Sequence, residues 1–159
     1  MKKSPLKRRQ PLSRKSRLNS TTGTVARSRG ISKVTPAKLK KELDRLFSIY
    51  IRSKYPPYCY TCGRTGTLQC GHFVSRAYLA TRWDESNCRP QCVGCNIYGN
   101  GKPLDFEENL KKELGDNVVE EMKKKRHTIT KVGIQWYQEQ ISHYKDLIKD
   151  YDRNTEQNI

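Results

Sequence analysis

Apolar residues recur at helical spacing in two parts of the chain, and a region of different character separates them. The first part follows Thr35 and Pro36, which have the features of a helix N-cap and a first helical position. Its apolar stripe consists of Leu39, Leu43, Leu46, Phe47 and Tyr50. This spacing predicts an amphipathic helix over 36–54 whose apolar face packs in a core, and Pro56 and Pro57 end it.

The second helical part fills the C-terminal third of the chain. Its pattern predicts a helix over 104–114 closed by Gly115, another from 117 to about 125, and a long helix that begins near Thr130. The apolar positions of the long helix are Ile134, Tyr137, Ile141, Tyr144 and Ile148. We expect the chain to fray after Tyr151.

Positive charge is concentrated in the first 41 residues. They contain fourteen basic residues and no acidic one, in a chain that has 32 Lys and Arg against 16 Asp and Glu. Residues 1–34 also contain hardly any large apolar side chain, so we expect a disordered basic arm that binds a polyanion. A solubilising tail is the alternative interpretation.

The low apolar content of the chain bears on its cellular location and on the size of its core. No apolar stretch approaches the roughly 20 residues needed to span a bilayer, and the N-terminus lacks the apolar run of a signal peptide. We therefore expect a cytoplasmic protein with no membrane partner. Only 34% of the residues are hydrophobic, so the core is thin and something besides apolar burial should help to hold the domain together.

Four of the six cysteines form two closely spaced pairs, Cys59-Tyr-Thr-Cys62 and Cys92-Val-Gly-Cys95. In a reducing compartment such pairs are metal ligands more often than disulfides. Two knuckles of this spacing complete a tetrahedron around one structural Zn²⁺, although an iron–sulfur cluster uses the same ligands. The remaining two, Cys70 and Cys88, are expected to be buried thiols, with replacement of a knuckle ligand as the alternative.

Several residues between and after the knuckles carry a resemblance to a known family. They are Gly71-His72-Phe73, Asn87, and Asn96 directly after Cys95. Together with the two cysteine pairs, this arrangement resembles the HNH, or ββα-metal, endonucleases. It is most similar to the NinG/Rap recombination nucleases of lambdoid phages. The resemblance covers about residues 55–105 and does not include the basic arm.

The resemblance implies a catalytic role for three residues. His72 matches the histidine that acts as general base, and imidazole chemistry suits removal of a proton from the attacking water, with a spare zinc ligand or a satisfied polar residue as the alternative. Asn87 matches the asparagine that holds the loop and orients the histidine ring, or else it serves only as a turn former. Asn96 falls where these enzymes bind a catalytic Mg²⁺ or Mn²⁺, with helix capping as the alternative.

Two positions depart from the wider motif. Gly71 stands where many relatives have a metal-binding Asp or His, and Tyr98 stands where several have His. Gly71 offers no side chain to a cation, so the catalytic ion has a single strong candidate ligand. Asp84 or Glu85, in the adjoining loop, could supply a carboxylate.

Basic residues flank the expected site, with Tyr78 and Trp83 between them. These are Arg76, Arg82, Arg89 and Lys102. We expect them to contact DNA phosphates, although each could be an ordinary solvated residue. The sequence assigns no role to His127 or His143.

The fold class expected from these patterns is α+β, with a small zinc-stabilised ββα-metal core flanked by helices. The expected parts are a basic arm (1–34), an N-terminal helix (35–54), the core (55–105), C-terminal helices (106–152) and a frayed tail (153–159).

The expected function is metal-dependent cleavage of branched recombination DNA, such as four-way junctions and D-loops. A homodimer formed through the C-terminal helices would supply two cutting sites. The cytoplasm would be that of a host bacterium if a phage encodes the chain. The alternatives are a non-catalytic zinc-knuckle DNA-binding recombination accessory protein and an HNH nuclease with sequence-specific activity.

Overall fold

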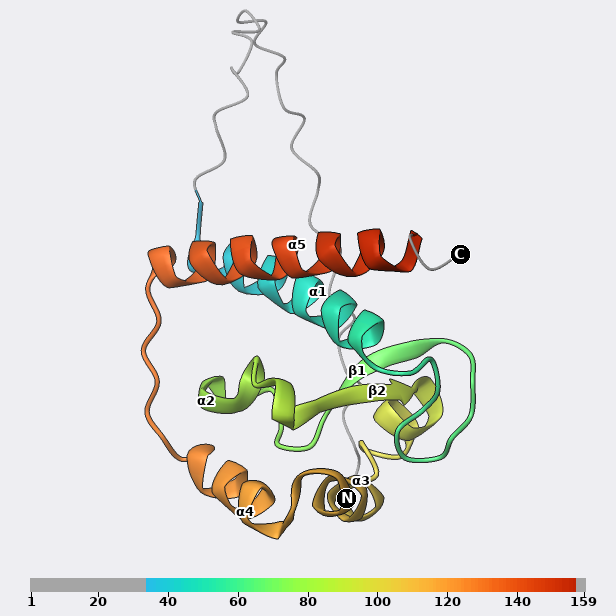
Figure 1. Cartoon of the computed structure of the whole chain (residues 1–159). Helices are drawn as coiled ribbons and strands as arrows, with labels where there is room; N and C mark the ends of the chain where they lie inside the picture. Colours follow the sequence, from blue (N-terminus) through green and yellow to red (C-terminus); the bar gives the residue numbers. More distant parts are fainter. Residues whose placement is uncertain (1–33, 157–159) are drawn as a thin grey trace, which may run out of the picture. The chain divides into compact units, whose positions relative to one another are not determined.

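A computed structural model describes the backbone of residues 34–156 and the side chains of residues 34–153. The expected arm therefore lies outside the described residues except for Val34, and so does the end of the tail. The elements are α1 (Pro36–Lys54), β1 (Leu68–His72), α2 (Leu79–Arg82), η1 (Glu85–Asn87), β2 (Cys88–Cys92), η2 (Gly94–Tyr98), α3 (Pro103–Leu114), α4 (Asp116–Lys125) and α5 (Ile134–Glu156) (Figure 1). The described part is thus a mixed fold of helices and one small sheet.

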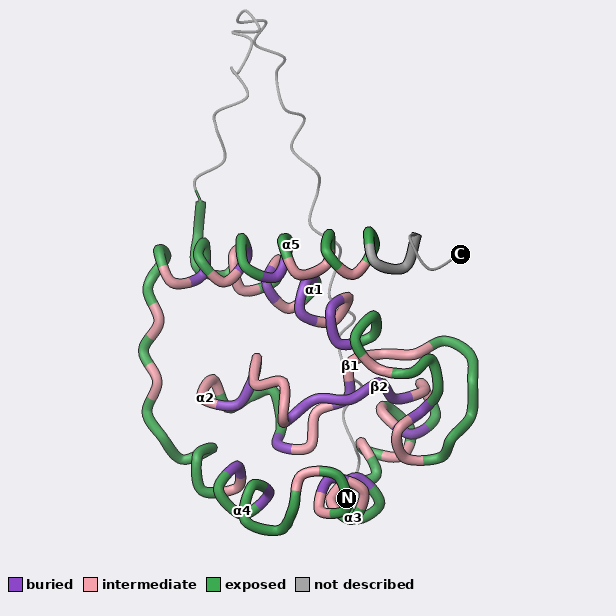
Figure 2. The backbone as a smooth tube through the Cα atoms, viewed as in Figure 1, coloured by how far each residue is buried: buried purple, intermediate pink, exposed green. Residues whose placement is uncertain are grey.

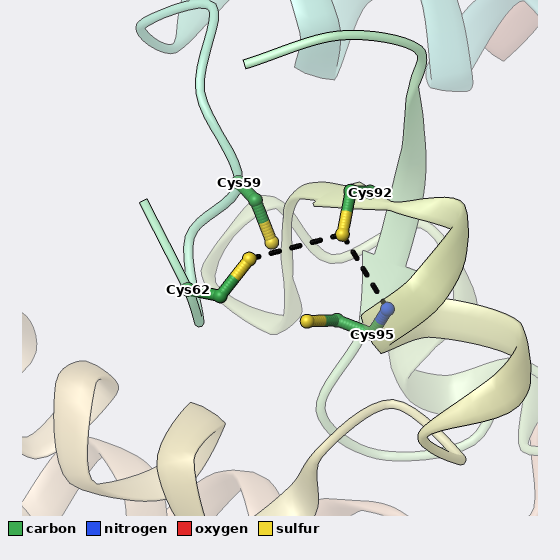
Figure 3. Close-up of side chains that lie close together, drawn as sticks. All are labelled: Cys59, Cys62, Cys92 and Cys95. Atoms are coloured by element: carbon green, nitrogen blue, oxygen red, sulfur yellow. Dashed lines mark hydrogen bonds between the residues drawn. The ribbon is translucent and has the colours of Figure 1, made fainter. Parts of the chain in front are cut away.

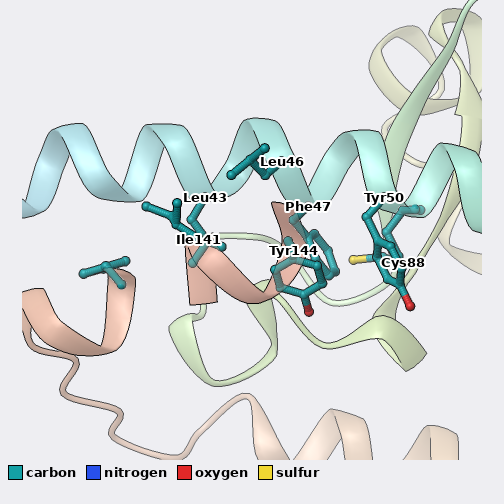
Figure 4. Close-up of a cluster of buried hydrophobic side chains, with 9 residues drawn as sticks. Leu43, Leu46, Phe47, Tyr50, Cys88, Ile141 and Tyr144 are labelled. Atoms are coloured by element: carbon teal, nitrogen blue, oxygen red, sulfur yellow. The ribbon is translucent and has the colours of Figure 1, made fainter. Parts of the chain in front are cut away.

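Helices α1 and α5 pack together and form the larger of two cores. Thr35 caps α1 by accepting a hydrogen bond from the Lys38 backbone N–H, as the sequence predicted. Figure 4 shows the α1 stripe meeting side chains of α5 around the edge-on ring pair of Phe47 and Tyr144. The stripe therefore serves packing, as expected.

The helix α5 differs from its prediction at both ends. It begins at Ile134 rather than near Thr130, because Gly133 is a poor helix residue and precedes it. It also continues past Tyr151, where fraying was expected. The Tyr151 ring packs against Tyr50 of α1, which is a tertiary contact, and Arg153 pairs with Asp150 one turn earlier within the helix.

Strands β1 and β2 form an antiparallel hairpin in which His72 lies opposite Cys88 and Gly71 lies opposite Arg89. Directly opposed residues share a face of the sheet. Cys70, His72 and Cys88 therefore lie on one face, and both of these cysteines pack against the α1–α5 core. Figure 2 shows β2 as the more deeply buried strand.

Helices α3 and α4 cover the other side of the hairpin and form a second, smaller core (Figure 1). Phe106, Leu110 and Val119 are its fully buried members, and Tyr60 and Phe73 pack against them. Both helices lie within a residue of their predicted bounds, and Gly115 separates them in a conformation with φ of 88°. The hairpin is thus held between two helical layers.

No helix among residues 34–156 combines the length and the apolar character required to cross a membrane.

Candidate metal centre and the pocket beside it

The two cysteine pairs converge on one point. Cys59 and Cys62 lie in the loop between α1 and β1, whereas Cys92 ends β2 and Cys95 lies in η2 (Figure 3). Their four sulfur atoms all lie within 4.8 Å of one another, and the Cys62 and Cys92 sulfurs are 3.8 Å apart. Zinc–sulfur bonds of about 2.3 Å give a tetrahedron with an edge of about 3.8 Å. The four cysteines therefore fit one zinc ion.

The backbone around each pair forms a tight knuckle. Gly63, with φ of 69°, donates its N–H to the Cys59 carbonyl at 2.8 Å, and the Cys95 N–H points to the Cys92 sulfur at 3.4 Å. A positive φ favours glycine, which explains Gly63 directly after Cys62. These local bonds position the two sulfurs within each knuckle.

The thiols of the cluster influence each other's ionisation. Burial raises the pKa of Cys59, but hydrogen bonds from the Thr61 hydroxyl and from backbone N–H groups outweigh it and lower that pKa to about 6. For Cys95 the Thr61 hydroxyl lowers the pKa, whereas burial and the neighbouring thiols together raise it to about 12. Four thiolates can share this space only when a cation neutralises them, which is the role of a structural metal.

A pocket of about 720 Å³ lies beside the cluster, along β1 and between α1 and η2. His72, Asn96 and Arg76 all line it, so three of the residues predicted to be functional meet here. They come from the end of β1, from η2 and from the loop before α2. The pocket is therefore the candidate site for chemistry, and Asn96, which lines it, directly follows Cys95 of the cluster.

His72 is oriented by the backbone. Its Nε2 lies 3.1 Å from the Arg82 carbonyl oxygen, which can only accept, so Nε2 carries the proton and Nδ1 keeps its lone pair. Burial lowers the pKa of His72, and although hydrogen bonds to the backbone of Arg82 and Cys70 raise it, the positive charges of Arg82 and Arg76 act with burial and the net shift is downward. The ring is therefore neutral at neutral pH and can act as a base.

Asn87 is fully buried and fastens the loop that follows β1. Its Oδ1 accepts from the Val74 N–H at 2.6 Å, and its Nδ2 donates to the carbonyls of Val74 and Thr81, each at 2.9 Å. Asn87 thus holds the loop, as expected, and its hydrogen bonds go to this loop and to α2 rather than to the His72 ring. The Arg82 carbonyl that bonds to the ring belongs to the residue after Thr81.

Asn96 lies in η2, a π-helical turn, and lines the pocket. Its Nδ2 donates to the side-chain oxygen of Gln69 on β1 at 2.7 Å. This bond engages the nitrogen, so Oδ1 is the Asn96 atom available to a hard cation.

Gly71 has a structural explanation. A Cβ at this position would lie 2.2 Å from Oε1 and 2.7 Å from Cδ of Gln91, so the Gln91 side chain would have to move. The buried Gln91 donates to the Gly101 carbonyl at 2.8 Å and to the Thr61 hydroxyl at 3.2 Å. The Gln91 side chain thus fills the space that a metal ligand at position 71 would need, and its hydrogen bonds connect the hairpin to both knuckle regions.

The carboxylate that reaches the pocket is Asp44, a residue that sequence reasoning missed. It lines the pocket from α1 and accepts from Arg82 at 2.8 and 2.6 Å and from the Trp83 indole at 3.0 Å. Its only sequence signal is an acidic residue at the border of an apolar stripe. The two carboxylates considered from the sequence, Asp84 and Glu85, are paired with Lys125 and Lys54 and line another pocket.

Two of the four residues predicted to contact DNA are buried, which contradicts the prediction for them. Arg89 is 1% exposed, pairs with Glu113 at 2.7 Å and lies over the Tyr55 ring. Arg82 is likewise buried and is held by Asp44. Both guanidinium groups are buried and paired within the protein, so neither can contact a DNA phosphate.

Arg76 and Lys102 remain available. Arg76 is exposed at the pocket and has no ion-pair partner in the described part of the chain. Lys102 is 51% exposed, follows a pocket residue and pairs with Asp105 at 3.5 Å, which is a weak contact at the surface. His127 and His143 do not line the pocket.

These features define a small α+β protein in which a four-cysteine cluster suited to zinc braces a hairpin beside an open polar pocket. The chain belongs to the family described as Bacteriophage Lambda NinG protein, which matches residues 1–156.

Two relatives, both named Protein ninG, come from Escherichia phage 933W and Enterobacteria phage VT2-Sa. Each is 28% identical to this chain over 86 residues, which is 52% of this chain. The matching segment spans 43% of each relative, which is less than half of its length. No solved structure matches this chain.

Proposed function

We propose that this protein is a metal-dependent endonuclease of the HNH type. The observation that carries the proposal is the position of His72, whose Nε2 is held by the Arg82 carbonyl, in a pocket that also contains Asn96 and Arg76. A hairpin followed by a helical turn, both attached to a zinc-binding cluster, is the arrangement expected of a ββα-metal core. The nuclease activity, the catalytic ion and the DNA substrate are parts of the same proposal.

In the proposed mechanism, Nδ1 of His72 removes a proton from a water molecule that attacks the phosphodiester. The Arg82 carbonyl holds the other ring nitrogen, and the resulting imidazolium is stabilised by that hydrogen bond. Arg76 binds a phosphate oxygen at the pocket rim. Asn96 Oδ1 would hold Mg²⁺ or Mn²⁺, which stabilises the charge that develops on the phosphate and the leaving oxygen.

The substrate in this proposal is branched recombination DNA, and the protein acts in the cytoplasm of the phage host. Membership in a phage family and the resemblance to recombination nucleases support this choice. Two active sites are needed to cut a junction symmetrically, so we place a homodimer contact on the C-terminal helices. The basic residues of the arm would supply phosphate contacts that do not depend on sequence.

A second candidate function is a non-catalytic DNA-binding module that uses the zinc knuckles as a scaffold. Gly71 favours it, because the pocket lacks the usual side chain before the base. The hydrogen bond between Asn96 and Gln69 favours it as well, since that bond already gives Asn96 a structural role.

The test is cleavage of a labelled four-way junction and a matched linear duplex, with Mg²⁺ or with EDTA. We expect the wild type to cut the junction only with Mg²⁺, and we expect His72→Ala to bind the junction but not cut it. His143→Ala is the matched control, because His143 is an exposed histidine on α5, outside the pocket. Absence of any Mg²⁺-dependent cut by the wild type, over a range of salt concentrations, would favour the binding module.

A further inference from the structure

A second group of metal-binding side chains lies on the hairpin, apart from the four-cysteine cluster. Cys70 and His72 are two positions apart on β1 and therefore point to the same face, and Cys88 lies opposite His72 on β2. One ligand atom of each residue lies within 4.8 Å of the other two. The antiparallel register thus gathers two sulfurs and one imidazole nitrogen at a single point.

The imidazole has the orientation of a metal ligand. Metal-binding histidines usually donate their second ring N–H to a carboxylate or a backbone carbonyl, which fixes the tautomer and the ring. Nε2 of His72 makes this bond to the Arg82 carbonyl at 3.1 Å, which leaves Nδ1 as the nitrogen that would bind a metal. Asn87 bonds to the carbonyl of Thr81, the residue before Arg82 in α2, which helps to keep the ring in place.

The surroundings leave one coordination position open. Cys88 is fully buried, whereas Cys70 and His72 line the 720 Å³ pocket. Three protein ligands with a fourth position facing solvent are typical of an accessible zinc site rather than a closed structural one. Thiolate and imidazole ligands select zinc and similar ions over Mg²⁺, which prefers oxygen.

We infer that Cys70, His72 and Cys88 form a second site for a thiophilic divalent cation such as Zn²⁺, and that its occupation blocks the base function of His72. Binding forms two zinc–sulfur bonds and one zinc–nitrogen bond and releases the two thiol protons to solvent. The lone pair of Nδ1 is then used by the metal. The blocking effect rests on the proposed nuclease function, whereas the metal site itself does not.

The site would make the protein sensitive to the amount of zinc. One ion per chain fills the four-cysteine cluster, which has more thiolate ligands and no open position. A second ion enters the three-ligand site and stops Mg²⁺-dependent cleavage. Added Mg²⁺ would not reverse the effect, because it competes poorly for sulfur.

The experiment counts zinc ions per chain by native mass spectrometry as Zn²⁺ is added to the full chain. We expect two ions on the wild type and on His143→Ala, and one on Cys88→Ser and on Cys70→Ser. We expect the affinity for the second ion to fall more than tenfold in each serine variant, since changes in second-layer partners alone cause tenfold losses. Cys70 is only partly buried, so Cys70→Ser decides the question if Cys88→Ser does not fold.

A Co²⁺ titration followed by absorption gives an independent view of the ligands. The first equivalent should show the strong sulfur-to-metal charge transfer of four thiolates, and the second a weaker band that disappears in His72→Ala. A wild type that binds one ion in excess zinc would overturn the inference. A second ion that persists in both serine variants would overturn it too.

The inhibition is measured separately, as the cleavage rate of each protein with two equivalents of Zn²⁺ divided by its own rate with one. We expect a fall of more than tenfold for the wild type and no fall for Cys70→Ser. If the wild type binds two ions and its cleavage does not fall, His72 is not blocked and the inference fails. If no protein cuts DNA at all, the proposed function fails while the zinc counts still decide the site.

Discussion

The four-cysteine cluster and the pocket beside it are built from neighbouring residues but in opposite ways. The cluster is assembled by local turns, is closed by four similar ligands and fits a structural ion. The pocket is assembled from α1, β1 and η2, and its polar groups differ in charge and in hydrogen-bonding capacity. The difference indicates that the cluster gives the hairpin its stability, while the pocket is left free to carry chemistry.

Removing a ligand from the cluster should have the largest effect on the fold. We expect Cys92→Ser to lose the zinc and to unfold the hairpin region, because structural zinc contributes about 10 kcal/mol or more in small zinc domains. Circular dichroism and thermal unfolding with and without a chelator measure this loss. Cys70→Ser is the matched control, since Cys70 lies on the same hairpin outside the cluster, and an equal loss in that variant would contradict the assignment.

Asn87→Ala tests whether the pocket depends on a buried side chain that does not reach it. The substitution removes the Asn87 bonds to the Val74 N–H and the Val74 carbonyl, and one of the bonds to the Thr81 carbonyl, so we expect a loss of about 3 kcal/mol in unfolding free energy. We also expect slower cleavage, because the carbonyl that orients His72 moves with the loop. Urea unfolding and a single-turnover rate test both parts. An unchanged cleavage rate in a folded variant would mean that the loop held by Asn87 does not affect the base function of His72.

The ion pair of Arg89 and Glu113 should contribute stability that depends on pH. Burial raises the pKa of Glu113, but hydrogen bonds from Arg89 and Tyr60 outweigh this and lower it overall. The stabilisation is therefore present above the unfolded pKa and is lost as the pH falls through the folded pKa.

We expect Glu113→Gln to cost about 2 kcal/mol at pH 7, a modest value because solvent screens the partly exposed carboxylate. The difference from the wild type should shrink once the pH falls below 4.5, as urea unfolding at several pH values would show. A difference that stayed constant down to pH 3 would mean that the charge on Glu113 contributes nothing.

Arg76→Ala should have the smallest effect. Loss of one phosphate contact should weaken DNA binding only a few-fold and reduce the slope of log affinity against log salt by about 1. Fluorescence anisotropy at several salt concentrations measures it, with Arg45→Ala, an exposed arginine of α1 paired with Glu42, as the control. An unchanged slope would mean that Arg76 does not contact a DNA phosphate.

The local features of this molecule could be predicted from the sequence, and the long-range ones could not. The helix over 36–54 and the two cysteine pairs depend on spacing within a few residues, and both have the expected geometry. The partners of Arg82 and Arg89 lie 38 and 24 residues away, so nothing near them in the sequence marks them as buried. A buried arginine and an exposed one cannot be distinguished in the sequence until the position of the carboxylate that pairs with each is known.

The pocket shows the same limit. Asp44 reaches it from a helix that the sequence assigned only to packing, and Gln91 fills the space beside Gly71 from the opposite strand. The absence of a ligand at Gly71 was visible in the sequence. Its reason was not, because the reason is a contact across the hairpin.

The measurement that tests the central claim most directly combines zinc content and junction cleavage on the same preparations of wild type and His72→Ala. With one equivalent of zinc, we expect both proteins to keep the ion in the four-cysteine cluster, and we expect cleavage by the variant to be at least about 100-fold slower. Cleavage by His72→Ala at the wild-type rate would contradict the account, as would a loss of cleavage that accompanies loss of the cluster ion.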